Sequence, residues 1–536
     1  MTTRPSLLRS TLTFSGGTFV SRVLGLVREQ AIAYAFGANA ATDAFWVAFR
    51  IPNFLRRLFA EGSFSVAFVP VFTEVKETRS HEELKQLVAR TAGTLGGVLL
   101  VVTALGMLGA SWVARGFAPG SIDEPVKLAL TTDLLRITFP FLLFVSLTAL
   151  AGGVLNSFHK FGLPALTPVI LNLCMIAGAL WLAPHLGTPI MALGWAIFVA
   201  GILQLLVQLP ALRALDLLSL PRWGWSHPDV RRIMRLMVPT LFGSSVAQIN
   251  LLLDTLIASF LISGSQTWLP QTDRLLEFPL GIFGVALGTV ILPSLSRHHV
   301  STDRDGFAKA LDWGLRTALL ISVPAMLALV LLAKPILATL LQHGRFTAHD
   351  VDMAALSLSA LSFGLPAFAL VKVVAPAFYA RQDTKTPVRA GIVAMIANMV
   401  MNILFVGLLF YLWHTPDQLG DGWLAAIAKV PGLHMGLALA SALASYLNLA
   451  QLWLALRRDG IYAGQPGWRA HWLRLGASCA AMVAVLLVGL AAWSDWSAWD
   501  TWTRVVRLAI LIAAAGGTFV AVLFACGFRF GHLRAH

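Results

Sequence analysis

Apolar runs about as long as a bilayer is thick recur along the whole chain, separated by short polar or Pro/Gly-rich breaks. A transmembrane helix needs about 20 mostly apolar residues, and about 14 runs reach that length. Of the 536 residues, 57% are hydrophobic and only 12% are charged, which leaves no soluble domain of useful size. The sequence therefore predicts an all-α integral membrane protein with about 14 transmembrane helices.

The predicted spans divide the chain into membrane helices and short connections. They cover residues 10–35, 44–72, 90–114, 131–156, 163–183, 189–211, 235–262, 268–295, 310–333, 351–377, 388–412, 432–456, 472–492 and 503–527. The first span carries Arg22 and Arg28 and lacks a small-residue cleavage site. We therefore expect a retained first helix rather than a removed signal peptide.

Lysine and arginine residues gather in alternate connections. The connections after even-numbered spans hold roughly 20 of them, and those after odd-numbered spans hold about 6. This positive-inside pattern predicts that both termini lie in the cytoplasm. It also accounts for the net charge of +14 through membrane orientation, so no nucleic-acid partner is expected.

An internal repeat is predicted at an offset of roughly 220 residues. Residues 62–67 match residues 281–286, and the loops before Pro164 and Pro387 recur at the same offset. Because the repeating unit holds an even number of helices, the sequence predicts two six-helix lobes related by a parallel repeat, with a substrate cavity between them. The predicted parts are an N-terminal lobe at 1–220, a C-terminal lobe at 221–460 and two accessory helices at 461–536.

The sequence contains no GxxxxGK[ST] loop for a nucleotide and no HExxH or paired Cys/His pattern for zinc. Cys174, Cys479 and Cys526 lie in apolar spans without CxxC spacing and are interpreted as small core residues. We expect a transporter rather than an enzyme, with no catalytic centre, metal or cofactor. Transport without ATP must use an ion gradient or the membrane potential, which supplies ~2.3 kcal/mol per charge per 100 mV.

Several arginines lie inside or at the edges of the predicted spans, where a cation costs at least ~2.5 kcal/mol. They are Arg22, Arg28, Arg56, Arg57 and Arg274. Arginines in such places face a watery cavity and mark a substrate path, so the expected substrate is anionic. Guanidinium groups bind phosphate in a bidentate manner, and several of them from both lobes would suit a diphosphate.

In the first span, Arg22 and Arg28 are six residues apart, about 240° around a straight helix. Both reach one cavity only if the helix bends, and Gly25 lies where it could bend. Alternatively, Arg28 pairs with a neighbouring acid and only serves helix packing.

In the second span, Asp43 is predicted to be a gate or cap residue near the outer end of the helices. Arg57 and Glu61 have the spacing of an intrahelical ion pair, which need not have a function. Arg56 has no obvious partner within its own turn and is therefore a candidate to bind the ligand.

The eighth span opens with Asp273 and Arg274, followed by Glu277. Arg274 could contribute a guanidinium group from the second lobe. Alternatively, Asp273 and Glu277 neutralise it.

Seven segments closely resemble the MurJ (MviN) lipid II flippases, and the resemblance extends over essentially the whole chain. These segments are 21–25, 41–45, 52–62, 68–70, 273–275, 284–289 and 378–387. The chain departs from the family pattern at Glu29, where the family has Asp, and at Gln271-Thr272, where the family has Tyr-Ala. These changes concern the reach of one carboxylate and the packing near the eighth helix.

The resemblance implies a 14-helix, MATE-like fold of the multidrug/oligosaccharidyl-lipid/polysaccharide (MOP) exporter superfamily. Such a protein moves lipid II, the undecaprenyl-diphosphate-linked peptidoglycan precursor, from the inner to the outer leaflet of the bacterial inner membrane. It would serve peptidoglycan biosynthesis and cell shape, with peptidoglycan synthases or divisome proteins as possible partners. The positions carried over from the family are Ser21, Arg22, Arg28, Asp43, Arg56, Glu61 and Arg274.

A coupling-cation site is a second hypothesis. Asp254 lies mid-span in the seventh predicted helix, and Asn398 and Asn402 share a face of the eleventh. Family members with a sodium site place it on these helices. Alternatively, Asp254 is a carboxylate that is hydrogen-bonded to neighbouring helices.

Three other functions are alternatives to lipid II transport. A flippase for another polyprenyl-linked glycan shares the arginine chemistry, and only the family motifs argue against it. A drug/cation antiporter would line its cavity with carboxylates and aromatic residues rather than arginines. A membrane-embedded glycosyltransferase or ligase would need a catalytic acid or base on the outer side, where the acidic residues are scattered near polar turns.

Overall fold

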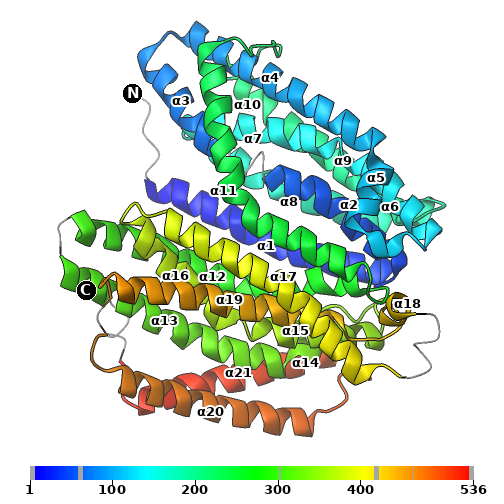
Figure 1. Cartoon of the computed structure of the whole chain (residues 1–536), viewed down its shortest axis with the longest axis vertical. Helices are drawn as coiled ribbons and strands as arrows, with labels where there is room; N and C mark the ends of the chain where they lie inside the picture. The colour runs from blue at the N-terminus through cyan, green and yellow to red at the C-terminus, as the bar shows by residue number, and fades with distance from the viewer. Residues whose placement is uncertain (1–6, 58–63, 301–302, 416–421, 463, 530–536) are drawn as a thin grey trace. The chain divides into compact units, whose positions relative to one another are not determined.

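The fold is described from a computed structural model, which describes residues 7–57, 64–300, 303–415, 422–462 and 464–529. The regular elements in these ranges are helices (Figure 1). Ten helical stretches among them are long and apolar enough to cross a membrane. The chain is therefore an all-α, multi-pass membrane protein, as the sequence predicted.

The helices pack into two compact units, Met1–Gln266 and Thr267–His536. The first unit contains the helices α1 (Leu7–Phe36), α2 (Ala40–Arg56), α3 (Phe64–Thr78), α4 (His81–Leu108), α5 (Ala110–Phe117), η2 (Pro119–Ser121), α6 (Pro125–Thr138), α7 (Phe141–Ser157), α8 (Gly162–Ala177), η3 (Gly178–Leu182), η4 (Ala183–His185), α9 (Met191–Leu206), α10 (Leu209–Arg213) and α11 (Pro228–Ala258).

The second unit begins in the first turn of α12. Its helices are α12 (Ser265–Val300), α13 (Arg304–Leu331), α14 (Ala333–Leu340), α15 (Ala348–Ser362), α16 (Leu365–Tyr379), α17 (Lys385–Trp413), α18 (Trp423–Ile427), α19 (His434–Arg458), α20 (Trp468–Ala492) and α21 (Thr501–Ala525). In Figure 1 the accessory pair α20 and α21 lies side by side in orange and red, next to α13 and α14.

Ten of the predicted spans coincide with the ten apolar stretches. The other four coincide with α1, with α2 and α3 together, with α11 and with α12. These are the helices that carry the candidate binding arginines and Asp254. The total of fourteen membrane helices stays a prediction.

Prolines and helix caps set the local boundaries. The predicted span 131–156 divides into α6 and α7 at Pro140, because proline has no backbone N–H to continue the helical hydrogen bonds. α2 begins with a capping box, in which Asn39 Oδ1 accepts from Thr42 N at 3.2 Å and Thr42 Oγ1 accepts from Asn39 N at 2.8 Å. This cap places Asp43 in the first turn of α2, where the helix dipole favours an acidic side chain.

Two apolar cores in the described part of the first unit hold α2 and α3. One lies where α2, α6 and α9 meet, around the rings of Phe45, Trp46 and Phe49. In the other, Phe64, Phe68 and Phe72 form a ladder along α3, with successive ring centroids 5.1 and 5.2 Å apart. Together they fix α2 and α3, the two helices of the second predicted span.

The second unit is built around α13. One core joins α13 to α16 and α19, and a smaller one joins it to the accessory helix α20 through Leu319, Leu475 and Cys479. Cys479 is buried, as expected for a core cysteine, whereas Cys526 is exposed and Cys174 is half-buried. The expectation that all three cysteines are core residues is therefore wrong for Cys526.

α11 packs with the first unit. Val230 and Ile233 lie in the α3 core, and Arg79 Nη1 forms an ion pair with Asp229 Oδ2 at 2.8 Å. Along the chain, the boundary between the compact units thus falls after residue 266. The boundary between the predicted lobes 1–220 and 221–460 falls before α11. The predicted boundaries describe a repeat rather than packing, and the repeat and the accessory pair 461–536 stay predictions.

Candidate functional site

Arg28 lies in a buried polar contact between α1 and α8. It is 3% exposed, its Nη1 donates to Asn172 Oδ1 at 3.1 Å, and its Nη2 forms an ion pair with Glu29. Asn172 Nδ2 in turn donates to the carbonyl oxygen of Ser21 at 3.0 Å. Ser21, Gly25 and Arg28 follow the i, i+4, i+7 pattern of one helix face, so Asn172 lies along this face of α1.

The pairing of Arg28 with Glu29 is the one that the sequence analysis gave as an alternative to substrate binding. Arg22 is half-buried, six residues earlier on α1. α1 is one continuous helix through Gly25. A Cβ atom on Gly25 would lie 3.9 Å from Asn172 Nδ2. Substrate binding by Ser21, Arg22 and Arg28 stays a prediction.

Asn172 was missed by the sequence analysis. The signal was present, because a lone asparagine inside an apolar helix is expensive in a membrane and faces the protein interior. Its amide accepts from a guanidinium group and donates to a backbone carbonyl at the same time, which an apolar residue cannot do.

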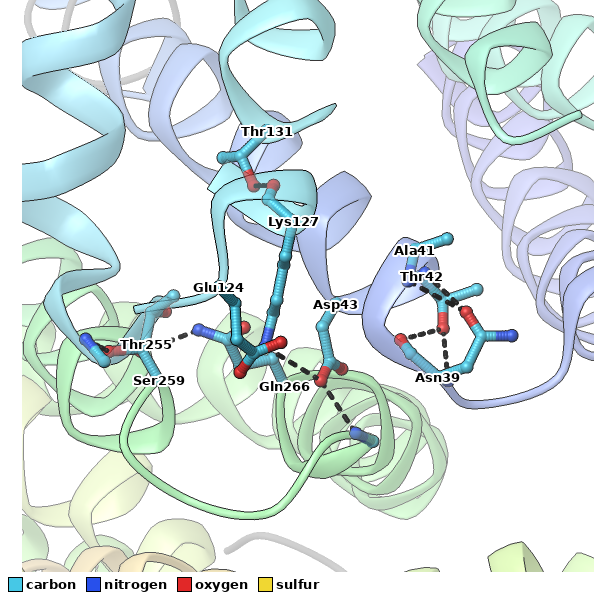
Figure 2. A network of polar contacts seen from close by, with 12 residues as sticks. Asn39, Ala41, Thr42, Asp43, Glu124, Lys127, Thr131, Thr255, Ser259 and Gln266 are labelled. Atoms are coloured by element: carbon cyan, nitrogen blue, oxygen red, sulfur yellow. Dashed lines mark hydrogen bonds and ion pairs between the residues drawn. The ribbon is translucent and has the colours of Figure 1, made fainter. Parts of the chain in front are cut away.

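Asp43 is 1% exposed and lies at the end of the α11–α12 turn (Figure 2). Its Oδ2 accepts a hydrogen bond from Gly264 N at 2.7 Å and lies 3.8 Å from the Nζ of Lys127 on α6. Gly264 has a φ of 102°, a conformation that favours glycine. Asp43 thus connects the start of α2 with the residue that precedes α12, and its role as a gate stays a prediction.

Three further arginines follow Asp43, two on α2 and one, Arg57, at its C-cap. Arg50 is buried and donates to Thr255 Oγ1 on α11, and Arg57 Nη1 donates to Gln248 Oε1 on the same helix at 3.3 Å. Arg56 Nε donates to Asn53 Oδ1 at 3.0 Å, so the expectation that Arg56 has no partner within its own turn is wrong. An asparagine three residues earlier lies within reach of a helical arginine.

Glu61, the predicted ion-pair partner of Arg57, lies outside the described residues. Its role in supporting the binding arginines therefore stays a prediction.

Arg274 lies in the second unit on α12. Its Nη1 forms an ion pair with Glu277 Oε2 at 3.3 Å, and the two side chains are 39% and 60% exposed. This is the neutralisation that the sequence analysis gave as an alternative, with Glu277 as the partner. An exposed pair of this kind contributes little free energy, so a phosphate can replace the carboxylate at small cost. Asp273 is half-buried next to it.

The three residues of the predicted cation site lie in different units. In the first unit, Asp254 Oδ2 accepts from Asn250 Nδ2 at 3.4 Å, one turn earlier on α11. In the second unit, Asn398 and Asn402 are buried on α17, and Asn398 Oδ1 accepts from Ser441 Oγ on α19 at 3.4 Å. Oxygen ligands suit sodium, and the site stays a prediction.

Comparisons with known proteins agree on one family. The family model described as "Lipid II flippase MurJ" matches residues 32–414. The chain is 43% identical to a probable lipid II flippase MurJ of Vibrio cholerae, over 100% of this chain and 99% of the relative. It is 42% identical to the lipid II flippase MurJ of Burkholderia cenocepacia, over 99% of each.

Solved structures show the same architecture. A lipid II flippase MurJ in an inward closed conformation matches with a TM-score of 0.75 at 26% identity, covering 95% of this chain and 99% of that one. An inward-facing MATE-family transporter of the MOP superfamily matches with a TM-score of 0.63 at 12% identity, covering 84% and 98%, which shows a shared fold. The predicted resemblance is thus confirmed, and the chain belongs to the MurJ lipid II flippase family.

Proposed function

We propose that this protein is a lipid II flippase, which moves the undecaprenyl-diphosphate-linked peptidoglycan precursor from the inner to the outer leaflet of the bacterial inner membrane. The observation that carries the proposal is the 43% identity, over the full length, to a relative named as a probable lipid II flippase. The arginines on α1, α2 and α12 support the proposal, because an anionic diphosphate needs cations inside the membrane.

The diphosphate is bound by Arg22, Arg28, Arg56 and Arg274. In the structure, Arg28 and Arg274 each hold a glutamate carboxylate, Glu29 and Glu277. A phosphate presents the same kind of acceptor oxygens to a guanidinium group as a carboxylate does. Binding is therefore an exchange of anions, in which the diphosphate takes the place of the glutamates on the two guanidinium groups.

Transport follows alternating access. The lobes present the bound head group first to the inner and then to the outer side, while the lipid tail stays in hydrocarbon along a groove beside α20 and α21. Asp43 acts as a gate residue, because its carboxylate joins the start of α2 to the α11–α12 turn through Gly264.

The energy comes from the membrane potential or from a sodium ion bound by Asp254, Asn398 and Asn402. Moving one charge through the field supplies ~2.3 kcal/mol per 100 mV. Replacing Asp254 with Ala should abolish any sodium dependence of transport, and an unchanged dependence would remove the cation site. Both termini lie in the cytoplasm, and peptidoglycan synthases or divisome proteins receive the product.

The test is complementation of a strain depleted of its own flippase, with lipid II measured separately in the two leaflets. Wild type should restore outer-leaflet lipid II, whereas Arg28→Ala and Arg274→Ala at matched expression should not. Arg136→Ala is the control, because it removes an exposed arginine from an ion pair with Asp133 on α6. If wild type inserts correctly but fails, a flippase for another polyprenyl-linked glycan becomes the better account.

A further inference from the structure

Lys127, near the start of α6, is buried beside Asp43 although it lies just before the predicted span 131–156. It is 5% exposed, and its Nζ lies 3.8 Å from Asp43 Oδ2 and 4.0 Å from Glu124 Oε1 (Figure 2). Lysine is almost never buried to this extent unless it is paired. The ammonium group therefore needs the two carboxylates, and the more deeply buried of them is Asp43.

The same oxygen of Asp43 meets two different groups. Gly264 N lies 2.7 Å from Oδ2, which is a hydrogen bond, whereas the 3.8 Å to Lys127 Nζ is longer than a hydrogen bond. Lys127 consequently acts on Asp43 through its charge, and Gly264 acts through direct contact. An ionised carboxylate that is 1% exposed requires a nearby cation to offset its lost hydration, and Lys127 supplies one.

The α11–α12 turn has other supports that do not involve Lys127. Gln266 Nε2 donates to the carbonyl oxygen of Thr255 at 3.1 Å, and Gly120 N donates to Ser259 Oγ at 3.1 Å. Gly120 also lies so close to Ser259 that a Cβ on it would be 2.2 Å from the Ser259 carbonyl oxygen. The turn should therefore keep its fold without Lys127. The position of the Asp43 carboxylate is what should change.

We propose that Lys127 is a positioning residue for Asp43, which holds the Asp43 carboxylate directed at Gly264 N. It thereby controls how firmly the α11–α12 turn is held on α2. The inference deepens the proposed function, because the Asp43–Gly264 contact is the one assigned there to the gate. In a transport cycle this contact must open and re-form, and the fixed charge of Lys127 brings Asp43 back to the same place.

The test measures the turn and transport separately in the full-length protein. Ser265 is buried and adjacent to Gly264, so Ser265→Cys provides a thiol that reacts when the turn opens, once Cys174, Cys479 and Cys526 are replaced by Ser. The protein is placed in lipid nanodiscs and the rate of maleimide labelling at residue 265 is measured. Transport is measured as outer-leaflet lipid II in the flippase-depleted strain.

Lys127→Met should raise the labelling rate and lower transport, each about tenfold, because it removes the charge that holds Asp43. Lys127→Arg keeps the charge, and its longer head group can span the 3.8 Å gap, so both readouts should stay within about twofold of wild type. Arg136→Met is the matched control on α6, because it removes an exposed ion pair, and it should change neither readout.

A double-mutant cycle separates positioning from a general structural role. In Asp43→Asn the amide oxygen can still accept from Gly264 N, but the charge is gone. Adding Lys127→Met to this background should change labelling and transport by less than about twofold. Equal effects of Lys127→Met in both backgrounds, or no effect in wild type, would overturn the proposal.

Two further outcomes are informative. If Lys127→Met does not give folded protein, recovery of folding by the added Asp43→Asn supports the pairing, and lack of recovery overturns it. If wild type fails to restore outer-leaflet lipid II while labelling depends on Lys127 and Asp43 as expected, the flippase proposal fails and the positioning role stands.

Discussion

Helices α2 and α20 differ in which side chains they bury and which they expose. Every residue of α2 from Thr42 to Pro52 is buried, and these residues include the charged Asp43 and Arg50. α20 buries a stripe that includes Leu475, Cys479 and Met482, and it leaves large apolar side chains exposed on its other face.

The difference follows from the solvent. In water an exposed apolar helix face is costly, but in a bilayer that face meets lipid tails and costs nothing. Charged groups must then lie inside the protein, where other residues replace the missing water. Exposure of apolar residues on α20 therefore marks contact with lipid, and burial of charge on α1 and α2 marks the part of the protein where substrate chemistry is expected.

The largest effect is expected from Arg28→Ala, which removes a buried charge on α1. It leaves Glu29 buried without this counter-ion and should cost about 3–5 kcal/mol of stability. Adding Glu29→Ala should restore most of that stability but not transport, because the diphosphate still lacks its guanidinium group. Thermal unfolding of the purified protein and leaflet-resolved lipid II would measure the two effects. Recovery of transport in the double variant would show that Arg28 serves only to pair with Glu29.

A buried arginine on the accessory helix α21 should behave differently from Arg28. Arg504 on α21 donates to the carbonyl oxygens of Ala338 at 2.9 Å and Gln342 at 3.3 Å near the end of α14, and to that of Ser497 at 2.8 Å. Arg504→Met should cost about 2–3 kcal/mol through these lost hydrogen bonds to a charged donor. Transport per folded molecule should remain at the wild-type level. A loss of transport at matched folded protein would mean that the accessory pair takes part in binding.

A smaller effect is expected at Asn172. Asn172→Ala removes one hydrogen bond from Arg28 and one to the Ser21 carbonyl oxygen, which should cost about 1–2 kcal/mol. Arg28 keeps Glu29, so transport should fall less than in Arg28→Ala. The same two assays apply, and a variant as inactive as Arg28→Ala would indicate that Asn172 itself contacts the substrate.

The smallest effect is expected on the lipid-facing side of α20. Val488 is 71% exposed, and Val488→Ala should change stability by less than about 0.5 kcal/mol. Leu486, two residues earlier and fully buried, is the control, and Leu486→Ala should cost about 2–5 kcal/mol by leaving a cavity. Thermal unfolding in one lipid mixture compares them. Similar losses for both variants would mean that Val488 packs against protein rather than lipid.

The charged positions on α1, α2 and α12 were predictable from the sequence, and so were the pairings of two arginines with acids close to them in the chain. The sequence marked Arg28 and Arg274 as cations inside or at the edge of membrane spans, and it raised the pairing of each with a nearby acid as an alternative. These pairs were foreseeable because Glu29 and Glu277 are close in sequence. The error at Arg56 arose because Asn53 was not counted as a partner, although an asparagine three residues earlier is within reach.

The sequence by itself determined that the chain crosses the membrane many times and belongs to this family. Both depend on local information, since the apolar length of a span and the residues of a motif do not change with packing. Only the tertiary structure decided which helix each charge faces: Asn172 reaches Arg28 across 144 residues, and Gly264 reaches Asp43 across 221. Such contacts depend on the rotation and neighbours of each helix, which are set by the packing of side chains distant in sequence.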